Sequence, residues 1–483
     1  MSYNLNDYFQ LGLDSEAQPQ NSLVMNTIRS PVNTQSGRDG LSKVTFKMPK
    51  IGMLTGDSMV TVQFIENASA VAGGTPAYGS GNATPNFISG ALGCIERARL
   101  LVDNKVLTDL ERPSMLEIPK MYSERTENEV AEFSNKFLAT QFQTTVKASD
   151  GTEQFNIPKT RYFSDSAETN TAVQNTIRNR ISSQANSKVY GLHLKHLGAQ
   201  FLENDSLPVF LLGDRELVLE LFFYKDCREY IVTGPGTAGQ LVADTVIVNY
   251  PLVELVTTHI QLPDEVQSNE VANLASNPVS YPLHDNYVVK SNITTRDLTT
   301  QTTQKTFRIN AQNRELHKLL MVHSPLMSNS DGTNRTVANQ QALALGSVSF
   351  QMKSNGLNLY ERPITNPSII YQQTTYAHNN MALKLPYGSF HVNNRQDSIP
   401  QSQQHLYLTY RGTQHYMAID FKNGNGGVFG GGSVQKQAME IDYEVVGRSG
   451  ANPNQGNTQF DVLFYLEVSK MLTIGQRSID ISF

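Results

Sequence analysis

The sequence predicts an all-β protein of two tandem antiparallel β-sandwiches, with short helices in the loops. Three observations support this prediction. Apolar residues alternate with polar ones in many short segments, which is the period of a strand with one buried face. The chain of 483 residues is too long for one ordinary hydrophobic core, so two domains are expected. The order of strands and loops in the first half recurs in the second half, which indicates a duplicated unit.

The composition favours strands and turns over long helices. Charged residues make up only 17% of the chain, whereas 39% is hydrophobic and can supply real cores. The 33 Gly and 20 Pro suit many turns between strands. The net charge is −5, and Lys and Arg are scattered along the chain, so we expect no sequence-specific nucleic acid binding. The polar first residues indicate no signal peptide, and no stretch approaches the roughly 18 apolar residues of a membrane span. We therefore expect a soluble protein made in the cytosol.

Residues 1–40 are predicted to form an extended N-terminal arm, with room for one short helix, because they show no sustained apolar period. The first sandwich is predicted over 41–265. Its early strands are expected near 43–48 and 59–65, and a long polar loop follows them. Residues 113–139 differ from their surroundings, since Pro113 can open a helix; one or two helices are expected there.

Strands return at about residue 188. The segment 217–223 places Leu217, Leu219, Leu221 and Phe223 on the inward face, with Glu216 and Glu220 outward. A closing strand is predicted at 252–262 and ends in an acidic turn. Residues 266–300 show no strong strand pattern before about 286, so they are predicted to be a linker.

The second sandwich is predicted over 301–483, including a C-terminal tail. Its last strand places Val462, Phe464, Leu466 and Val468 on one face. A glycine-rich stretch at 424–432 interrupts the late strands and lacks the pattern of a phosphate-binding loop, so a surface loop is expected.

One segment of the internal repeat aligns without gaps when the second half is shifted by 250 positions. Ala98, Leu100 and Val102 then fall on Val348, Phe350 and Met352, and Leu107 falls on Leu357. The identity Glu111-Arg112-Pro113 falls on Glu361-Arg362-Pro363 in the same register. Two copies do not make a solenoid, which needs three or more units, so two sandwiches of roughly eight strands each are the better prediction.

Each residue that could carry chemistry also has a structural interpretation. His193 and His196 lie three apart, but the segment is predicted to be a strand, which places them on opposite faces rather than on one metal. Cys94 and Cys227 are too few and too far apart for a disulfide framework or a zinc site, and buried small hydrophobic residues are the preferred interpretation. We predict no catalytic, cofactor-binding or metal-binding residues, no cofactor, and no enzyme activity.

Acidic residues and glycosylation motifs give the same result. Glu440, Asp442 and Glu444 all point outward from one predicted strand, which is typical of a solvated face, and Asp264-Glu265 is a turn. A glycosidase would need two carboxylates in a cleft with aromatic platforms, and the chain contains no Trp. Five Asn-X-Ser/Thr motifs are expected to be unused without a signal peptide.

Three stretches resemble the double jelly-roll major capsid proteins of the adenovirus-like lineage of double-stranded DNA viruses, and most of all those of virophages and polinton-like viruses. They are GALGCIERARLLVDNKVLTDL, a strand pair with an Asn-Lys turn; LPVFLLGDRELVLELFFY, a late strand region; and LVELVTTHIQLPDEVQSNEV, which leads from the first unit into the second. The likeness covers about 40–475. It implies two tandem eight-stranded antiparallel jelly-roll β-sandwiches.

The resemblance also implies a function. It implies a major capsid protein of the virion, assembled inside the infected host cell, whose homotrimer is a pseudo-hexagonal capsomer tiling an icosahedral shell. The expected partners are neighbouring capsomers and the penton and minor capsid proteins of the same virus; a contact with an internal membrane stays open, with nothing in the sequence favouring it. Two alternatives stay open: a minor capsid component, and a two-domain β-sandwich protein or enzyme that binds polysaccharide.

Overall fold

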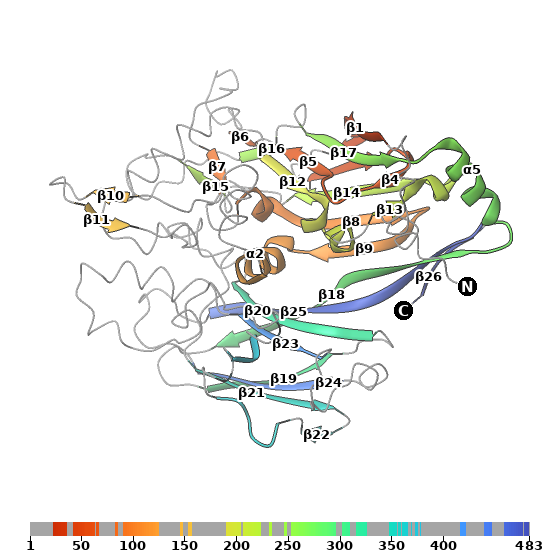
Figure 1. Ribbon diagram of the computed structural model, residues 1–483. Coiled ribbons are helices and arrows are strands. Elements are labelled where there is room, and N and C mark those ends of the chain that lie inside the picture. The colour runs from red at the N-terminus through yellow and green to blue at the C-terminus, as the bar shows by residue number, and fades with distance from the viewer. Residues whose placement is uncertain are drawn as a thin grey trace.

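The computed structural model consists of two antiparallel β-sandwiches packed against each other, drawn one above the other in Figure 1. The structure describes residues 23–35, 42–62, 64–66, 83–85, 90–124, 145–147, 153–156, 190–203, 206–223, 231–233, 246–248, 253–295, 302–309, 315–325, 347–354, 356–358, 360–365, 369, 372–374, 377, 416–421, 439–446, 458–476 and 478–482.

The first sandwich has two main sheets. One sheet contains β12 (Tyr190–His193), β5 (Met59–Val62), β17 (Glu254–Gln261) and β1 (Leu23–Arg29), with β4 (Met53–Leu54) and β13 (Leu207–Pro208) extending it. The other runs in the order β2 (Asn33–Gln35), β3 (Ser42–Lys47), β14 (Leu217–Phe223), β8 (Ile95–Val102) and β9 (Lys105–Glu111). Three two-stranded pairs accompany them: β10 (Thr145–Lys147) with β11 (Glu153–Asn156), β15 (Ile231–Thr233) with β7 (Ala83–Pro85), and β16 (Val246–Val248) with β6 (Phe64–Glu66).

The second sandwich repeats this arrangement. One sheet runs β18 (Val279–Thr295), β25 (Thr458–Ile474), β20 (Glu315–Pro325) and β23 (Tyr416–Asp420), and β26 (Ile479–Ser482) pairs with the end of β25. The other runs β19 (Thr302–Ile309), β24 (Met439–Val446), β21 (Ser347–Ser354) and β22 (Leu357–Asn358).

Strand order identifies both units as jelly rolls. The sheet order β1-β17-β5-β12 corresponds to β18-β25-β20-β23, and β3-β14-β8-β9 corresponds to β19-β24-β21-β22. Each set of eight strands, counted along the chain, therefore pairs first with last, last with third and third with sixth in one sheet. The predicted fold class of two tandem eight-stranded jelly rolls is confirmed.

Helices are short and lie outside the sheets. Besides the helical residues 369, 372–374 and 377, the described helices are α2 (Pro113–Glu124), α5 (Asp264–Asn273) and the short 3₁₀ helices η2 (Gly90–Cys94), η4 (Leu194–His196), η5 (Gln200–Glu203) and η6 (Val209–Leu212). Pro113 opens α2 as predicted, because its missing N–H is not needed in a first turn. The rest of the predicted helical insertion lies outside the described residues.

Alternating burial follows the predicted inward faces. Leu217, Leu219, Leu221 and Phe223 of β14 are buried, and so are Ala98, Leu100 and Val102 of β8. Val462, Phe464, Leu466 and Val468 of β25 are buried too. These faces form the cores of the two sandwiches, as the period of two predicts.

Two segments predicted to lack strands contain them. The expected linker 266–300 carries most of α5 and the 17-residue strand β18, which pairs with β25 along its whole length. Within the expected arm, Leu23–Arg29 forms β1 and pairs with β17. In the corrected interpretation β1 and β18 are the equivalent first strands of the two jelly rolls.

The repeat is confirmed by strand order but not by the three-residue identity. In the first sandwich Glu111-Arg112-Pro113 ends β9 and opens α2, whereas Glu361-Arg362-Pro363 is exposed and precedes Ile364, the residue that pairs with Phe350. The first hairpin also turns at Asp103 and Asn104, which both have positive φ, rather than at the expected Asn-Lys pair.

Candidate functional site: the junction between the sandwiches

Strand β25 is buried on both of its faces, which makes the junction part of the core. On the inner face, Phe464 packs against Phe307 of the opposite sheet, with ring centroids 5.0 Å apart. On the outer face, Tyr465 is 1% exposed, and its hydroxyl donates to the backbone carbonyls of Glu111 (3.2 Å) and Arg112 (3.1 Å) in the first sandwich. The second sandwich therefore uses one sheet to bind its own partner sheet and the first sandwich at once.

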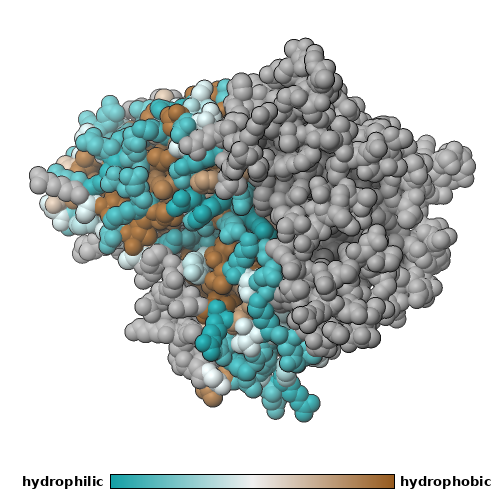
Figure 2. Space-filling view, turned by 180° about the vertical axis from the view of Figure 1, so that it is seen from behind, coloured by the Kyte–Doolittle hydropathy of each residue, from teal (hydrophilic) through white to brown (hydrophobic). Residues whose placement is uncertain are grey.

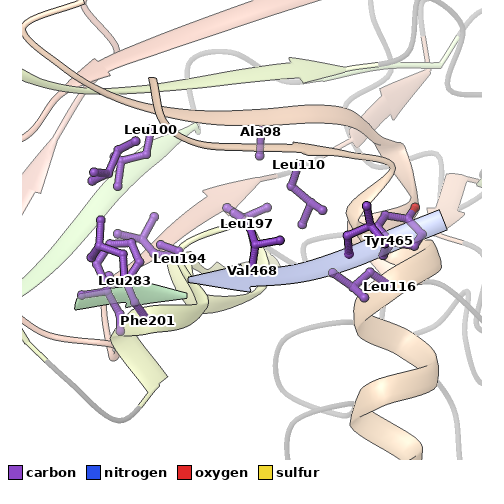
Figure 3. Packing of buried hydrophobic residues seen from close by; sticks show 14 of the residues in the cluster. Ala98, Leu100, Leu110, Leu116, Leu194, Leu197, Phe201, Leu283, Tyr465 and Val468 are labelled. Carbon is purple, nitrogen blue, oxygen red and sulfur yellow. The ribbon is translucent and has the colours of Figure 1, made fainter. Parts of the chain in front are cut away.

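Apolar side chains fill the space between the two sandwiches. Figure 3 shows Tyr465 beside Leu116 of α2, and Val468 beside Leu197, all of them buried. Leu283 of β18 lies close to Leu194 and Phe201. The buried apolar residues of both sandwiches form one continuous cluster. Full burial of such a side chain contributes about 1.5–3 kcal/mol, so the two units stabilise each other.

An ion pair between the sandwiches lies at the end of β9. Arg112 has φ 49° and donates its backbone N–H to Glu96 (2.7 Å), so the chain turns sharply into α2. Its guanidinium Nη2 lies 3.1 Å from Asp461 Oδ2, and both side chains are almost completely buried. Lys290 Nζ of β18 lies 3.4 Å from the same carboxylate oxygen. A buried charge is tolerated only with such partners, so this contact fixes the orientation of the two units.

A second polar cluster lies between α2 and the η4–η5 segment. His196 Nδ1 lies 2.8 Å from Glu117 Oε2, and both side chains are buried. Burial pushes the pKa of Glu117 upward, but the hydrogen bond and charge of His196, with Lys120 and Gln200, outweigh it and hold that pKa below its usual range. Gln200 also accepts a hydrogen bond from Asn286 of β18 (2.5 Å), so the cluster reaches the second sandwich.

A third contact uses a buried lysine of β25. Lys470 forms an ion pair with Asp285 of β18 and donates to the carbonyl of Leu107 in β9 (3.1 Å). Burial raises the pKa of Asp285, and the charge of Lys470 offsets this only in part. Farther along, Arg215 donates to the carbonyls of Gly475 (3.2 Å) and Gln476 (3.3 Å). The junction is thus held along its length by contacts that position the two sandwiches relative to each other.

The prediction for the two histidines was wrong in its geometry. β12 ends at His193 and a helical turn begins at Leu194, so His193 and His196 do not lie on opposite faces of one strand. Their rings meet edge to face with centroids 6.4 Å apart. Burial, together with the nearby His196 and Lys195, lowers the pKa of His193 to about 4. Within the described ranges, no group of three or more His, Cys, Asp or Glu could hold a metal ion.

The other candidate residues have structural positions. Cys94 is buried, as predicted, whereas Cys227 and the glycine-rich stretch lie outside the described residues. Glu440 and Asp442 of β24 alternate with buried neighbours and pair with Arg308 (3.0 Å) and with Lys353. Asp264 and Glu265 form the first turn of α5, where carboxylates favour the helix N-terminus.

Sequence reasoning missed the polar residues of the junction. Asp285, Asn286 and Lys470 lie in strands, yet their partners are 80 or more positions away, and no local pattern reveals them. None of the helices in the part of the chain that the structure describes is long and apolar enough to cross a membrane.

Comparison with known proteins shows which solved structures share the fold of this chain over nearly its whole length. No protein-family model and no curated protein matches the sequence. Three solved structures match with a TM-score of 0.54 and 10% identity: the Sputnik virophage structure (96% of this chain, 88% of that one), the mavirus major capsid protein (95% and 90%) and the Faustovirus major capsid protein (94% and 91%). The fold of the chain is therefore the double jelly roll of viral major capsid proteins, which confirms the resemblance at the level of the fold.

Proposed function

We propose that this chain is the major capsid protein of a double-stranded DNA virus and that it assembles as a homotrimeric, pseudo-hexagonal capsomer tiling an icosahedral shell. One observation carries the proposal: the likeness to major capsid proteins covers 94–96% of the chain and includes both sandwiches. A likeness confined to one sandwich would suit many unrelated β proteins, because one jelly roll is a widely shared fold.

The junction supports this role physically. Three chains with two similar sandwiches each supply six similar units around one axis, and such an outline fills a flat lattice only if the two units of a chain keep a fixed orientation. The contacts of Arg112, Tyr465 and Lys470 across the junction provide that constraint. Weak contacts between many identical copies then add up to a stable shell.

The proposed role is structural rather than catalytic. The partners are neighbouring capsomers and the penton and minor capsid proteins of the same virus. The location is the virion, after synthesis and assembly in the infected cell. The paired, outward acids of β24 fit a solvated face of such a shell.

Two measurements test the proposal. One is the share of the mass of purified particles that this protein makes up, and the other is whether the purified protein assembles without any other component. We expect it to dominate the particle by mass and to form sheets or shells with a hexagonal lattice at high concentration. A protein that is present in a few copies per particle and forms no lattice would be a minor component, and the proposal would fail.

A further inference from the structure

The first sandwich has an outer sheet face that nothing in the described chain covers. In the second sandwich the equivalent face includes β25, where Tyr465 is 1% exposed and donates to backbone carbonyls of the first sandwich, and where Leu463 is 0% exposed. On β1 of the first sandwich, Val24 and Ile28 are each 67% exposed. Two equivalent sheets thus differ in whether a sandwich covers them.

The exposed face carries apolar residues on three neighbouring strands, with Asn26, Thr258 and Glu254 between them. Val24 lies opposite Ile260 of β17, and Ile28 lies opposite Val256, which in turn lies opposite Met59 of β5. Residues directly opposite each other in an antiparallel pair point to the same face, so these side chains form rows on one surface. Figure 2 shows from behind that apolar side chains reach the surface of the described part among polar ones. Val24 and Ile28 are exposed, Val256 and Met59 are half-buried, and Ile260 packs against the core. Exposed aliphatic side chains that continue into half-buried ones are typical of an interaction surface.

The second sandwich carries the complementary half of the contact. On the first sandwich, the surface that packs against β25 in the junction is formed by β9 and α2. Helix α2 begins with the sequence PSML at 113–116. The second sandwich has the similar sequence PSII at 367–370, which begins three residues after Ile364, the partner of Phe350. PSML begins two residues after Glu111, the partner of Arg97. Residues 369, 372–374 and 377 are helical.

The apolar residues of this second half are uncovered. Ile369 is 42% exposed and Leu357 of β22 is 72% exposed, whereas Met115 of α2, which has the same place in PSML as Ile369 has in PSII, is 4% exposed. The second sandwich therefore presents the elements that form the junction, but no sheet of the same chain lies against them in the described residues.

We infer that the β22–helix end of the second sandwich (Leu357 and Ile369) docks on the β1–β17–β5 face of the first sandwich (Val24, Ile28, Val256) of a second copy of this chain. The partner is a second copy because the same contact already exists inside the chain, between equivalent elements. The inference rests on the proposed function and names the surfaces by which the copies would meet. Such a head-to-tail contact joins two different surface patches. Repeated contacts of this kind close a ring when the rotation from one copy to the next divides a full turn evenly.

The surfaces are tested with Ile28→Asp and Ile369→Asp, and Val271→Asp serves as the matched control because it lies on α5 and is 46% exposed. All three residues are exposed in the single chain, so circular dichroism should be that of the wild type, and the melting temperatures should agree when all proteins are measured as dilute monomers. Mass is measured by light scattering after size exclusion. We expect the wild type and the control to be trimers. Each of the other two variants should dissociate at a concentration at least about tenfold higher, because an unpaired carboxylate would be buried in the contact.

A mixture of the two variants distinguishes this contact from its alternatives. Each variant keeps one good patch, so the mixture should form a heterodimer that cannot close, while each variant alone stays monomeric. An effect of Ile28→Asp alone would mean that copies pair through β1 itself, and would overturn the inference. Trimers that persist in both variants would overturn the surfaces but leave the proposed function standing, whereas a monomeric wild type would overturn both.

Discussion

The ion pair of Arg112 and Asp461 determines how firmly the two sandwiches are joined. Asp461→Asn keeps the shape of the side chain and removes its charge, so the guanidinium loses its carboxylate while it stays 9% exposed. Breaking a buried pair in this way costs about 3–5 kcal/mol. Unfolding entropy is about 2.1 cal/mol/K per residue, or about 1 kcal/mol/K for the 483 residues, so the melting temperature should fall by about 3–5 °C.

Scanning calorimetry at neutral pH measures this shift. Asp442→Asn is the matched control, because Asp442 pairs with Lys353 at the surface, where the two side chains are 36% and 29% exposed. Solvent screens such an exposed pair, so it contributes little to stability and the control should melt within about 1 °C of the wild type. Adding Arg112→Met to Asp461→Asn should recover part of the loss, since no unpaired charge then remains. Equal shifts in Asp461→Asn and in the control would refute the argument that the pair is buried and joins the sandwiches.

Three further predictions concern stability. Tyr465→Phe removes a donor to two backbone carbonyls of the first sandwich and should cost about 0.5–1.5 kcal/mol, seen as a melting temperature about 1 °C lower; an unchanged value would contradict that contact. Burial lowers the pKa of His193 to about 4, so protonation of this side chain opposes folding. The contribution of neutral His193 to the free energy of unfolding should be complete above about pH 6.5 and should fall by up to about 3 kcal/mol as the pH drops toward 4. His193→Gln should flatten the dependence of the melting temperature on pH in this window. Gly52→Ala should cost about 3 kcal/mol or more, because φ is +52° and the new Cβ would overlap the Ile260 carbonyl oxygen. Gly213→Ala has φ +60° but open space around it, so it should cost only about 1–2 kcal/mol. Equal melting temperatures for the two variants would count against the overlap.

Much of the fold could be predicted because strands with one buried face alternate in sequence. β14 and β24 show this directly, since every second residue is buried against its own sandwich. β25 was predicted on one face only. Its run of consecutive apolar residues is typical of a strand buried on both sides, but it does not say what covers the second face.

The remaining strands were missed for two physical reasons. β18 contains the polar run His284-Asp285-Asn286, which imitates a linker because its partners, Lys470 and Gln200, come from distant elements. Among the described strands β1 lies at an edge, and its aliphatic residues Val24 and Ile28 are exposed on the outer face, so they contribute no inward period. The identity between 111–113 and 361–363 matched no equivalent position, because short identities arise by chance in a chain of this length.

Junction residues could not be found from the sequence for a related reason. Glu117 and His196 are stabilised by each other only after α2 and the η4 turn have packed together. Their spacing along the chain carries no pattern, and neither residue belongs to a motif. The sequence predicts that the chain has no catalytic residue, and this stays a prediction.

The most direct test of the central proposal is an electron microscopy map of the purified protein. The account predicts a particle with threefold symmetry and six lobes of similar size, each lobe one jelly roll, with adjacent lobes alternately joined within a chain and between chains. A particle with two lobes and no threefold axis at high concentration would contradict it.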